Sequence, residues 1–280
     1  MSEPAADPVD DLSHDESNQA ESRRAASPRV VHAVIRAEGE HELERSPLAL
    51  LFSGLAGGIA VSAAVLAQGA LHAGLPHGAD WASLVAAFGY SLGFVIAIMG
   101  RLQLFTETTV TAVLPVATEP TRTNFVRLLR LWTVVFIANM LGTLIVAALI
   151  AHDVIVPEDQ RASILELSRE TVMHDAGKTL VLAIPAGFLI ASIAWILPNA
   201  RGSELWVIVL ITWMVSIGKF SHVVAGSTEA FTLWLVGEIG FGKAVGGFIL
   251  PALIGNIIGG TGLFALLAHA QVRGDTDAEN

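Results

Sequence analysis

Long runs of apolar residues, separated by short polar segments, occupy most of this chain. A helix needs about 20 such residues to cross a bilayer. Four runs qualify without interruption, and they cover residues 48–73, 124–151, 170–197 and 244–270. Two further runs, 81–117 and 204–238, are interrupted by a glycine and a basic residue, Gly100-Arg101 and Gly218-Lys219. The pattern predicts an all-α polytopic membrane protein with six transmembrane helices, two of which are broken.

Composition supports this fold class and divides the chain into regions. Only 15% of the 280 residues are charged and 53% are hydrophobic, whereas a soluble domain has about 25% charged residues. The absence of cysteine excludes disulfides and thiolate metal sites. We expect a disordered acidic cytosolic tail at 1–28, an amphipathic helix at 29–46, a transmembrane channel domain at 47–272 and a cytosolic C-terminal tail at 273–280.

Basic residues near the ends of the spans predict the orientation in the membrane. With the N-terminus inside, ten basic residues lie on the cytoplasmic side and at most four on the other. The sequence therefore predicts a multi-pass protein of the cytoplasmic (inner) membrane with both termini in the cytoplasm. The net charge of −10 is concentrated in the N-terminal tail and gives no indication of a nucleic-acid partner.

The two halves of the chain repeat one another. Asn139 precedes Gly142 as Asn256 precedes Gly259, and the offset between the two motifs is 117 residues. The two breaks are offset by 118 residues, and a weaker similarity relates residues 57–62 to 187–192. Because each unit contains three spans, the second must enter the membrane from the opposite side. This 3+3 inverted repeat predicts a solute site at the midplane, where the broken helices meet.

The breaks contain the residues with candidate chemistry. Non-helical backbone at membrane depth occurs only where it is buried in protein or lines a wet cavity. Arg101 and Lys219 can either raise the affinity for an anion or form ion pairs with Glu107 and Glu229, which follow them in the sequence. We expect pairing, because a buried charge requires a partner. His222, in the second break, is the side chain able to exchange a proton near neutral pH.

Taken together, the motifs resemble those of the formate/nitrite transporter family, over roughly residues 45–272. The Gly-Arg and Gly-Lys breaks and the acidic N-terminal extension are most similar to its YfdC-like branch. The motifs that carry the resemblance are Tyr90-Ser91-Leu92-Gly93, Leu104-Phe105-Thr106, Asn139-x-x-Gly142 and Phe220-Ser221-His222.

This resemblance implies an aquaporin-like protomer that assembles as a homopentamer, with a pore in each protomer. It implies that His222 and Thr106 face each other across a central chamber and that Leu104 forms the inner constriction. Three positions depart from the family pattern: Gly226 stands for an asparagine, Ser221 stands for an acid, and no fourth-helix lysine aligns. The outer constriction and the path beside the histidine would be formed by Tyr90, Phe94, Val215 and Phe220.

The sequence thus favours a channel for small anions in the lipid bilayer, in which His222 orients the anion and supplies or relays a proton. A pore for neutral solutes is an alternative, although the paired Asn-Pro-Ala motifs of aquaporins are absent. A membrane scaffold or sensor that acts through residues 1–28 is another, and deleting the tail would distinguish it. We expect no enzyme activity, no cofactor and no metal site.

Overall fold

The computed structural model describes residues 25–76 and 79–279. The predicted acidic tail, 1–28, therefore lies outside the described residues except for its last four. The first helix, α2 (Pro28–Glu44), begins after Ser27, whose hydroxyl accepts a hydrogen bond from the Val30 backbone N–H. This helix occupies the segment in which the sequence predicts an amphipathic helix, and it buries the apolar side chains of Val31, Ile35 and Leu43.

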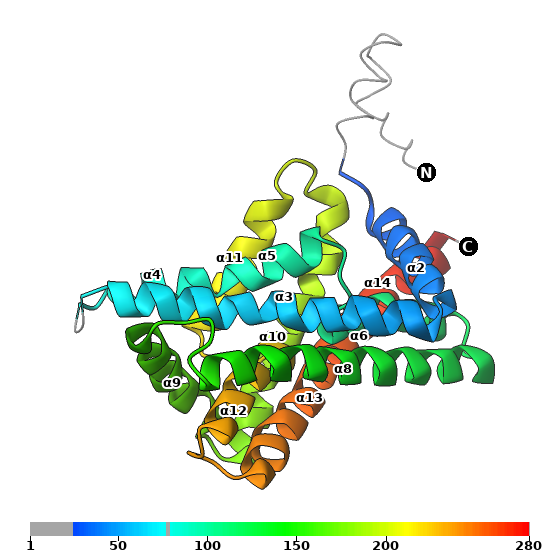
Figure 1. The fold of residues 1–280 in the computed structure, drawn as a ribbon. Coiled ribbons are helices and arrows are strands. Elements are labelled where there is room, and N and C mark those ends of the chain that lie inside the picture. The colour runs from blue at the N-terminus through cyan, green and yellow to red at the C-terminus, as the bar shows by residue number, and fades with distance from the viewer. Residues whose placement is uncertain (1–24, 77–78, 280) are drawn as a thin grey trace.

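The remaining helices form two sets along the chain. The first set is α3 (Pro47–Gly74), α4 (Ala82–Gly89), α5 (Ser91–Met99), α6 (Phe105–Thr111), α7 (Val113–Thr118) and α8 (Arg122–Ala151). The second is α9 (Glu158–Val172), α10 (Ala176–Ile196), η1 (Leu197–Asn199), α11 (Glu204–Ile217), α12 (Val223–Leu235), η2 (Lys243–Ile249), α13 (Leu250–Ile257), η3 (Ile258–Ala265) and α14 (Leu266–Glu279). The long helices α3 and α8 run side by side (Figure 1).

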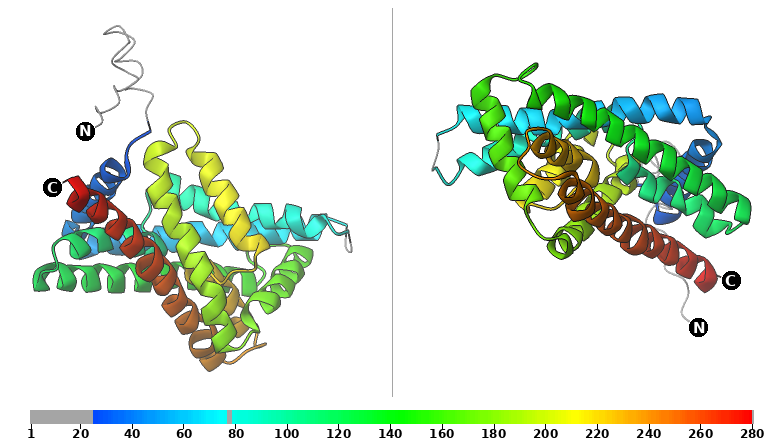
Figure 2. Two further views of the ribbon diagram at one scale, coloured as in Figure 1. Left: turned by 180° about the vertical axis from the view of Figure 1, so that it is seen from behind. Right: turned by 60° about the horizontal axis from the view of Figure 1, so that its bottom comes forward.

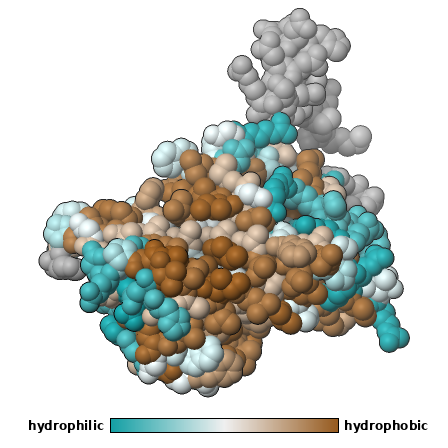
Figure 3. All heavy atoms as spheres, viewed as in Figure 1, coloured by the Kyte–Doolittle hydropathy of each residue, from teal (hydrophilic) through white to brown (hydrophobic). Residues whose placement is uncertain are grey.

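Five helices in the described part of the chain are long and apolar enough to cross a membrane. They are Pro47–Gly74, Ala82–Met99, Arg122–Ala151, Ala176–Asn199 and Lys243–Gly274. The sixth predicted span, 204–238, is divided into α11 and α12, neither of which has the length of a full crossing. Figure 3 shows apolar residues over most of one face, with polar residues gathered at two opposite ends. The apolar band between these ends is the surface expected of a protein embedded in lipid.

The same glycine contacts recur in both halves. A Cβ on Gly58 would collide with the Asn139 backbone, and one on Gly187 would collide with the Asn256 backbone. These contacts bring α3 against α8 and α10 against α13, because only a residue without a side chain allows such an approach. The structure thus aligns Gly187 with Gly58, a shift of one residue from the alignment of 57–62 with 187–192 predicted from sequence.

The two surface helices lie at opposite ends of the apolar band. α2 packs beside α14 at one end (Figure 2), and His32 and His269 share a hydrogen bond of 3.0 Å there. α9 lies at the other end, beside the C-terminal part of α3 (Figure 1). The first described residues and the C-terminal helix are therefore on the same side of the band.

Candidate functional site

Each break begins with a basic residue in the left-handed region of backbone conformation. Arg101 has a φ of 54° and Lys219 a φ of 50°. Residues other than glycine rarely adopt this conformation because the Cβ then crowds the backbone. In this position each residue ends its helix and lets the chain reverse into an extended segment that leads to the next half-helix. The first break joins α5 to α6, and the second joins α11 to α12.

One buried asparagine secures each break. The Oδ1 atom of Asn139 accepts the backbone N–H of Phe105 at 2.9 Å, and its Nδ2 donates to the carbonyls of Gly54 and Gln103 at 2.7 and 2.9 Å. Since Phe105 is the first residue of α6, the asparagine satisfies a backbone donor that has no partner within the helix.

Asn256 makes the same three contacts in the second half. Its Oδ1 accepts the N–H of Val223 at 2.8 Å, and its Nδ2 donates to the carbonyls of Ala183 and Ser221 at 2.8 and 3.0 Å. The Asn-x-x-Gly motif therefore has a direct structural role: its asparagine holds a half-helix, and its glycine lets the neighbouring helix approach.

The two breaks meet at His222 and Thr106. The His222 Nε2 atom lies 2.9 Å from the Thr106 hydroxyl, and its Nδ1 accepts the backbone N–H of Ala225 at 3.2 Å. Because Nδ1 is an acceptor, the neutral ring carries its proton on Nε2 and donates to Thr106. Thr106 is fully buried and His222 is 1% exposed. The hydroxyl proton of Thr106 thus remains available for another acceptor.

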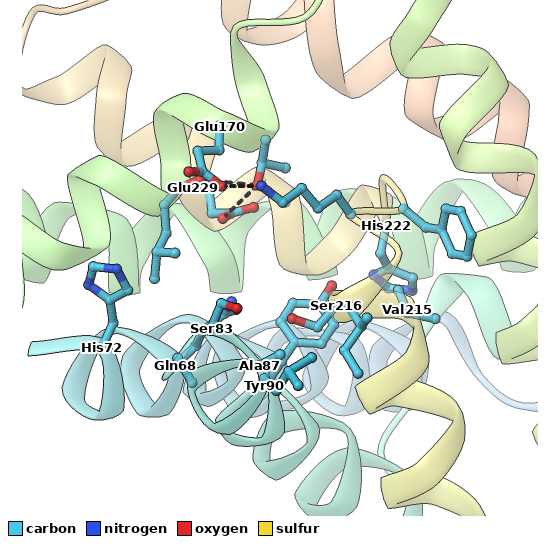
Figure 4. A pocket seen from close by; sticks show the side chains of 18 residues that line it. Gln68, His72, Ser83, Ala87, Tyr90, Glu170, Val215, Ser216, His222 and Glu229 are labelled. Carbon is cyan, nitrogen blue, oxygen red and sulfur yellow. Dashed lines mark hydrogen bonds and ion pairs between the residues drawn. The ribbon is translucent and has the colours of Figure 1, made fainter. Parts of the chain in front are cut away.

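A cavity lies on either side of this central pair. After the orientation predicted from the sequence, we name the cavity on the α9 side the outer cavity and the cavity on the α2 side the inner cavity. Their volumes are about 200 Å³ and about 370 Å³. Figure 4 shows Glu170 and Glu229 on one wall of the outer cavity, across from Gln68, Ser83 and Tyr90. The inner cavity is lined by Val34, Glu38, Ile98, Met99, Arg101, Glu107, Ala194, Leu197, Pro198, Glu204 and Ile208.

The other predicted path residues lie between or beside these cavities. Tyr90, Val215 and Phe220 line the outer cavity together with His222. Phe94 and Leu104 are fully buried and line neither cavity. The ring of Phe94 contacts both the His222 ring, with centroids 5.0 Å apart, and the Tyr90 ring, with centroids 5.2 Å apart.

The basic residues of the two breaks form ion pairs with other acids than those predicted from the sequence. Arg101 pairs with Glu38 of α2 at 3.2 Å, and Lys219 pairs with Glu170 of α9 at 2.7 Å. The prediction that they pair with Glu107 and Glu229 is therefore wrong. The physical reason is exposure: the side chains of Arg101 and Lys219 are 83% and 67% exposed, so each reaches an accessible acid on a surface helix instead of the less exposed acid of its own half-helix.

Sequence reasoning also missed the half-buried polar contacts that join the surface helices to the half-helices. In the first half, Glu42 of α2 accepts hydrogen bonds from the Gln103 amide at 3.1 Å and from the Thr111 hydroxyl at 2.8 Å. In the second half, the Thr171 hydroxyl of α9 donates to Glu229 of α12 at 3.2 Å. Burial raises the pKa of Glu42, and the hydrogen bonds from Gln103 and Thr111 oppose this shift.

One departure from the family pattern has a local explanation. A Cβ on Gly226 would lie 2.6 Å from Cε1 of Phe248, whose side chain is fully buried. The phenylalanine of the last span thus fills the space beside this position, and an asparagine would not fit there without moving the ring. Gly226 also lines the outer cavity, together with His222.

The chain is similar in sequence to a known family of membrane proteins. The sequence model of the formate/nitrite transporter family matches residues 29–270. The chain belongs to the formate/nitrite transporter family. It is 40% identical over 255 residues to the inner membrane protein YfdC of Escherichia coli (strain K12), covering 91% of this chain and 82% of that protein. The predicted resemblance to the YfdC-like branch is confirmed.

The chain is also similar to proteins described as channels. The formate channel BtFdhC of Bacillus thuringiensis is 25% identical over 253 residues, which cover 87% of this chain and 95% of that protein. A pentameric formate channel solved with formate bound has a TM-score of 0.69 and 20% identity, and covers 81% of this chain and 97% of that chain. This likeness shows that the fold is that of the formate/nitrite transporters.

Proposed function

We propose that this protein conducts small monovalent anions such as formate or nitrite across the cytoplasmic membrane. The observation that carries the proposal is the hydrogen bond between His222 and Thr106, which joins the two breaks in the layer that separates the outer and inner cavities. Family membership supports transport of this class of solute. The proposal includes assembly as a homopentamer, which the likeness to a pentameric formate channel supports. It also includes one pore in each protomer and, as the basic residues predict, both termini in the cytoplasm.

An anion that crosses the layer between the cavities must leave water, and the central pair lowers the free-energy cost of this step. Moving a bare carboxylate-sized anion into an apolar medium costs tens of kcal/mol by Born reasoning. An anion that enters from the outer cavity replaces Thr106 as the acceptor of the Nε2–H of His222, while the Thr106 hydroxyl donates its own proton to the same anion. Each hydrogen bond to a charged group contributes about 1.5–3 kcal/mol. His222 thereby orients the anion without a change in its protonation.

Supplying a proton from His222 would require a further step. With Nδ1 engaged by the Ala225 N–H, the ring has a single proton, on Nε2. Donating that proton would leave an imidazolate unless Nδ1 were protonated first, which would release the N-terminal backbone of α12. We therefore assign to His222 the role of a hydrogen-bond donor.

The test is flux of formate and nitrite into proteoliposomes that contain the purified protein. His222→Asn keeps a side chain that can cap α12 but is too short to reach Thr106. It should lower flux about 10- to 100-fold, the equivalent of one hydrogen bond to a charged group. Thr106→Val should act similarly, whereas Thr106→Ser, which retains the hydroxyl, should conduct.

Two outcomes would contradict the proposal. Unchanged flux in both His222→Asn and Thr106→Val would remove the central pair from the path. Rapid movement of water or glycerol through the wild-type protein, with no anion flux, would favour a pore for neutral solutes instead.

A further inference from the structure

Three arginines lie together where α2 ends and where α3 and α8 begin. Arg45 directly follows α2, and Arg127 and Arg130 are in the first three turns of α8. The Nη2 atom of Arg130 donates hydrogen bonds to the carbonyls of Leu43 and Arg45 at 2.7 and 3.2 Å. Arg127 precedes Arg130 by three residues and is therefore its neighbour on the surface of α8. We call these three residues the arginine cluster.

The arginine cluster carries positive charge that the described part of the chain does not neutralise. No acid in that part forms a salt bridge with Arg45, Arg127 or Arg130, and the buried Nε of Arg130 has no hydrogen-bond partner there. The acids nearest to Arg45 in sequence are Glu44, which is exposed, and Glu42, which accepts hydrogen bonds from other residues. Three arginines thus stand against two acids. Since Arg127 is exposed, an anion outside the protein can reach the cluster.

Exposed apolar side chains continue from the arginine cluster into the apolar band. Leu48 and Phe52 of α3 are exposed, as are Ile137 and Leu141 of α8. The two residues of α8 follow Arg130 by seven and eleven positions, which is the spacing of a single helix face. α3 and α8 run side by side from this end (Figure 1), and the polar end of the molecule is followed there by the apolar band (Figure 3). The cluster therefore lies at the boundary between the headgroups and the acyl chains of a bilayer.

This arrangement matches a phospholipid with a net negative charge. A guanidinium group binds a phosphate through two parallel hydrogen bonds, and basic pockets beside membrane helices on the cytoplasmic side are typical sites for anionic headgroups. We propose that the arginine cluster binds the headgroup phosphate of an anionic phospholipid, whose acyl chains lie against α3 and α8. The occupant is a lipid rather than a free phosphate, because only a lipid also covers the exposed apolar side chains.

Binding at this position joins three elements of the fold. The phosphate links Arg45, at the end of α2 and the start of α3, to Arg127 of α8, while Arg130 already holds two carbonyls at the end of α2. A ligand that binds only the folded state raises its stability, so the lipid stabilises the attachment of α2 to the membrane domain. None of the three arginines lines the outer or the inner cavity. The inference is therefore independent of the proposed function, and its test does not measure flux.

The experiment follows thermal unfolding of the full-length protein, freed of lipid in a neutral detergent, as phosphatidylglycerol is added. The unfolding temperature should rise and then saturate with phosphatidylglycerol. The zwitterionic lipid phosphatidylethanolamine and free glycerol phosphate should have little effect at the same concentrations. Arg45→Gln combined with Arg127→Gln should raise the half-saturating concentration about 25-fold, from about 5-fold for each arginine. Arg130 is kept, because losing its hydrogen bonds to the end of α2 would itself lower stability.

Arg201→Gln is the matched control. Arg201 is exposed, lies between η1 and α11 and is outside the cluster, so its replacement makes the same change of charge and should leave the response to phosphatidylglycerol unchanged. The inference is overturned if this control weakens the response as much as the double variant does, since net charge alone would then explain the binding. It is also overturned if phosphatidylethanolamine or glycerol phosphate acts as well as phosphatidylglycerol, or if the double variant responds like the wild type.

Native mass spectrometry of the same samples counts the bound lipids and the copies of the chain in the assembly. The double variant should lose bound phosphatidylglycerol and keep the wild-type number of copies. Loss of copies from the assembly with no loss of bound phosphatidylglycerol would contradict the inference, because it would assign the arginine cluster to a contact between copies of the chain.

Discussion

The two asparagines should be the most sensitive polar positions in the membrane domain. Asn139 is fully buried, and its side chain makes hydrogen bonds of 2.9, 2.7 and 2.9 Å to three backbone groups. Asn139→Leu leaves the Phe105 N–H and the Gln103 carbonyl buried without a partner, whereas the Gly54 carbonyl keeps its hydrogen bond within α3. Each group left without a partner costs about 1–3 kcal/mol, so the expected loss is about 2–6 kcal/mol, a large share of the roughly 5–15 kcal/mol by which domains are stable.

Thermal unfolding of the detergent-solubilised protein, followed by tryptophan fluorescence, measures this loss. The inverted repeat supplies a matched comparison, because Asn256→Leu removes the equivalent three bonds and should lower the unfolding temperature by a similar amount, about 10 °C or more. Ser62→Ala is the control. It removes one buried hydroxyl, which is 2.8 Å from both Gly58 O and Thr228 Oγ1, and should cost only about 1 kcal/mol. Asparagine variants no less stable than Ser62→Ala would refute the reasoning.

Three further predictions concern the packing and the charges around the site. Gly226→Ala should lower stability by about 1–3 kcal/mol through overpacking, and adding Phe248→Leu should restore most of it in the same unfolding assay. Because burial raises the pKa of Glu42, the wild-type protein loses stability as pH rises from about 4.5 through that raised value. Glu42→Gln should remove this slope in a series of unfolding temperatures against pH. Arg101→Gln breaks only the exposed pair with Glu38 and should change stability by less than about 1 kcal/mol.

Hydropathy and residue spacing predicted the features of the fold that lie within a single helix or span. The long apolar runs gave the helices that cross the band, and a basic residue inside such a run marked each break. The resemblance to the family then placed Thr106 opposite His222, and the structure sets them 2.9 Å apart. The spans and the breaks could be predicted from local patterns, because a long apolar run and a basic residue inside such a run are each unusual in themselves.

Contacts between distant elements could not be obtained in this way. The sequence suggested Glu107 as the partner of Arg101, since it is the nearest acid along the chain. Arg101, however, adopts the left-handed conformation, and its side chain, which is 83% exposed, reaches toward α2. There it meets Glu38, which lies 63 residues away in sequence. Predicting this pair would require both the backbone conformation at the break and the position of α2.

The inverted repeat extends beyond the spans in which its motifs are visible. Glu42 and Thr171 are separated by 129 residues, the same offset as Gly58 and Gly187, and Thr111 and Glu229 are separated by 118, the offset of the two breaks. The bond between Glu42 and Thr111 therefore corresponds to the bond between Thr171 and Glu229, with acid and hydroxyl exchanged.

This exchange makes α2 and α9 equivalent elements of the two halves, although their sequences show no common motif. What the two halves share is the hydrogen bond between a surface helix and a half-helix, rather than the residue type at either end. The position of the acid nevertheless has a consequence. In the second half it lies on the half-helix and lines the outer cavity, whereas in the first half it lies on the surface helix, and a different residue, Glu107, faces the inner cavity. The half-helices thus contribute one carboxylate to the lining of each cavity, Glu229 and Glu107, from positions that the repeat does not relate.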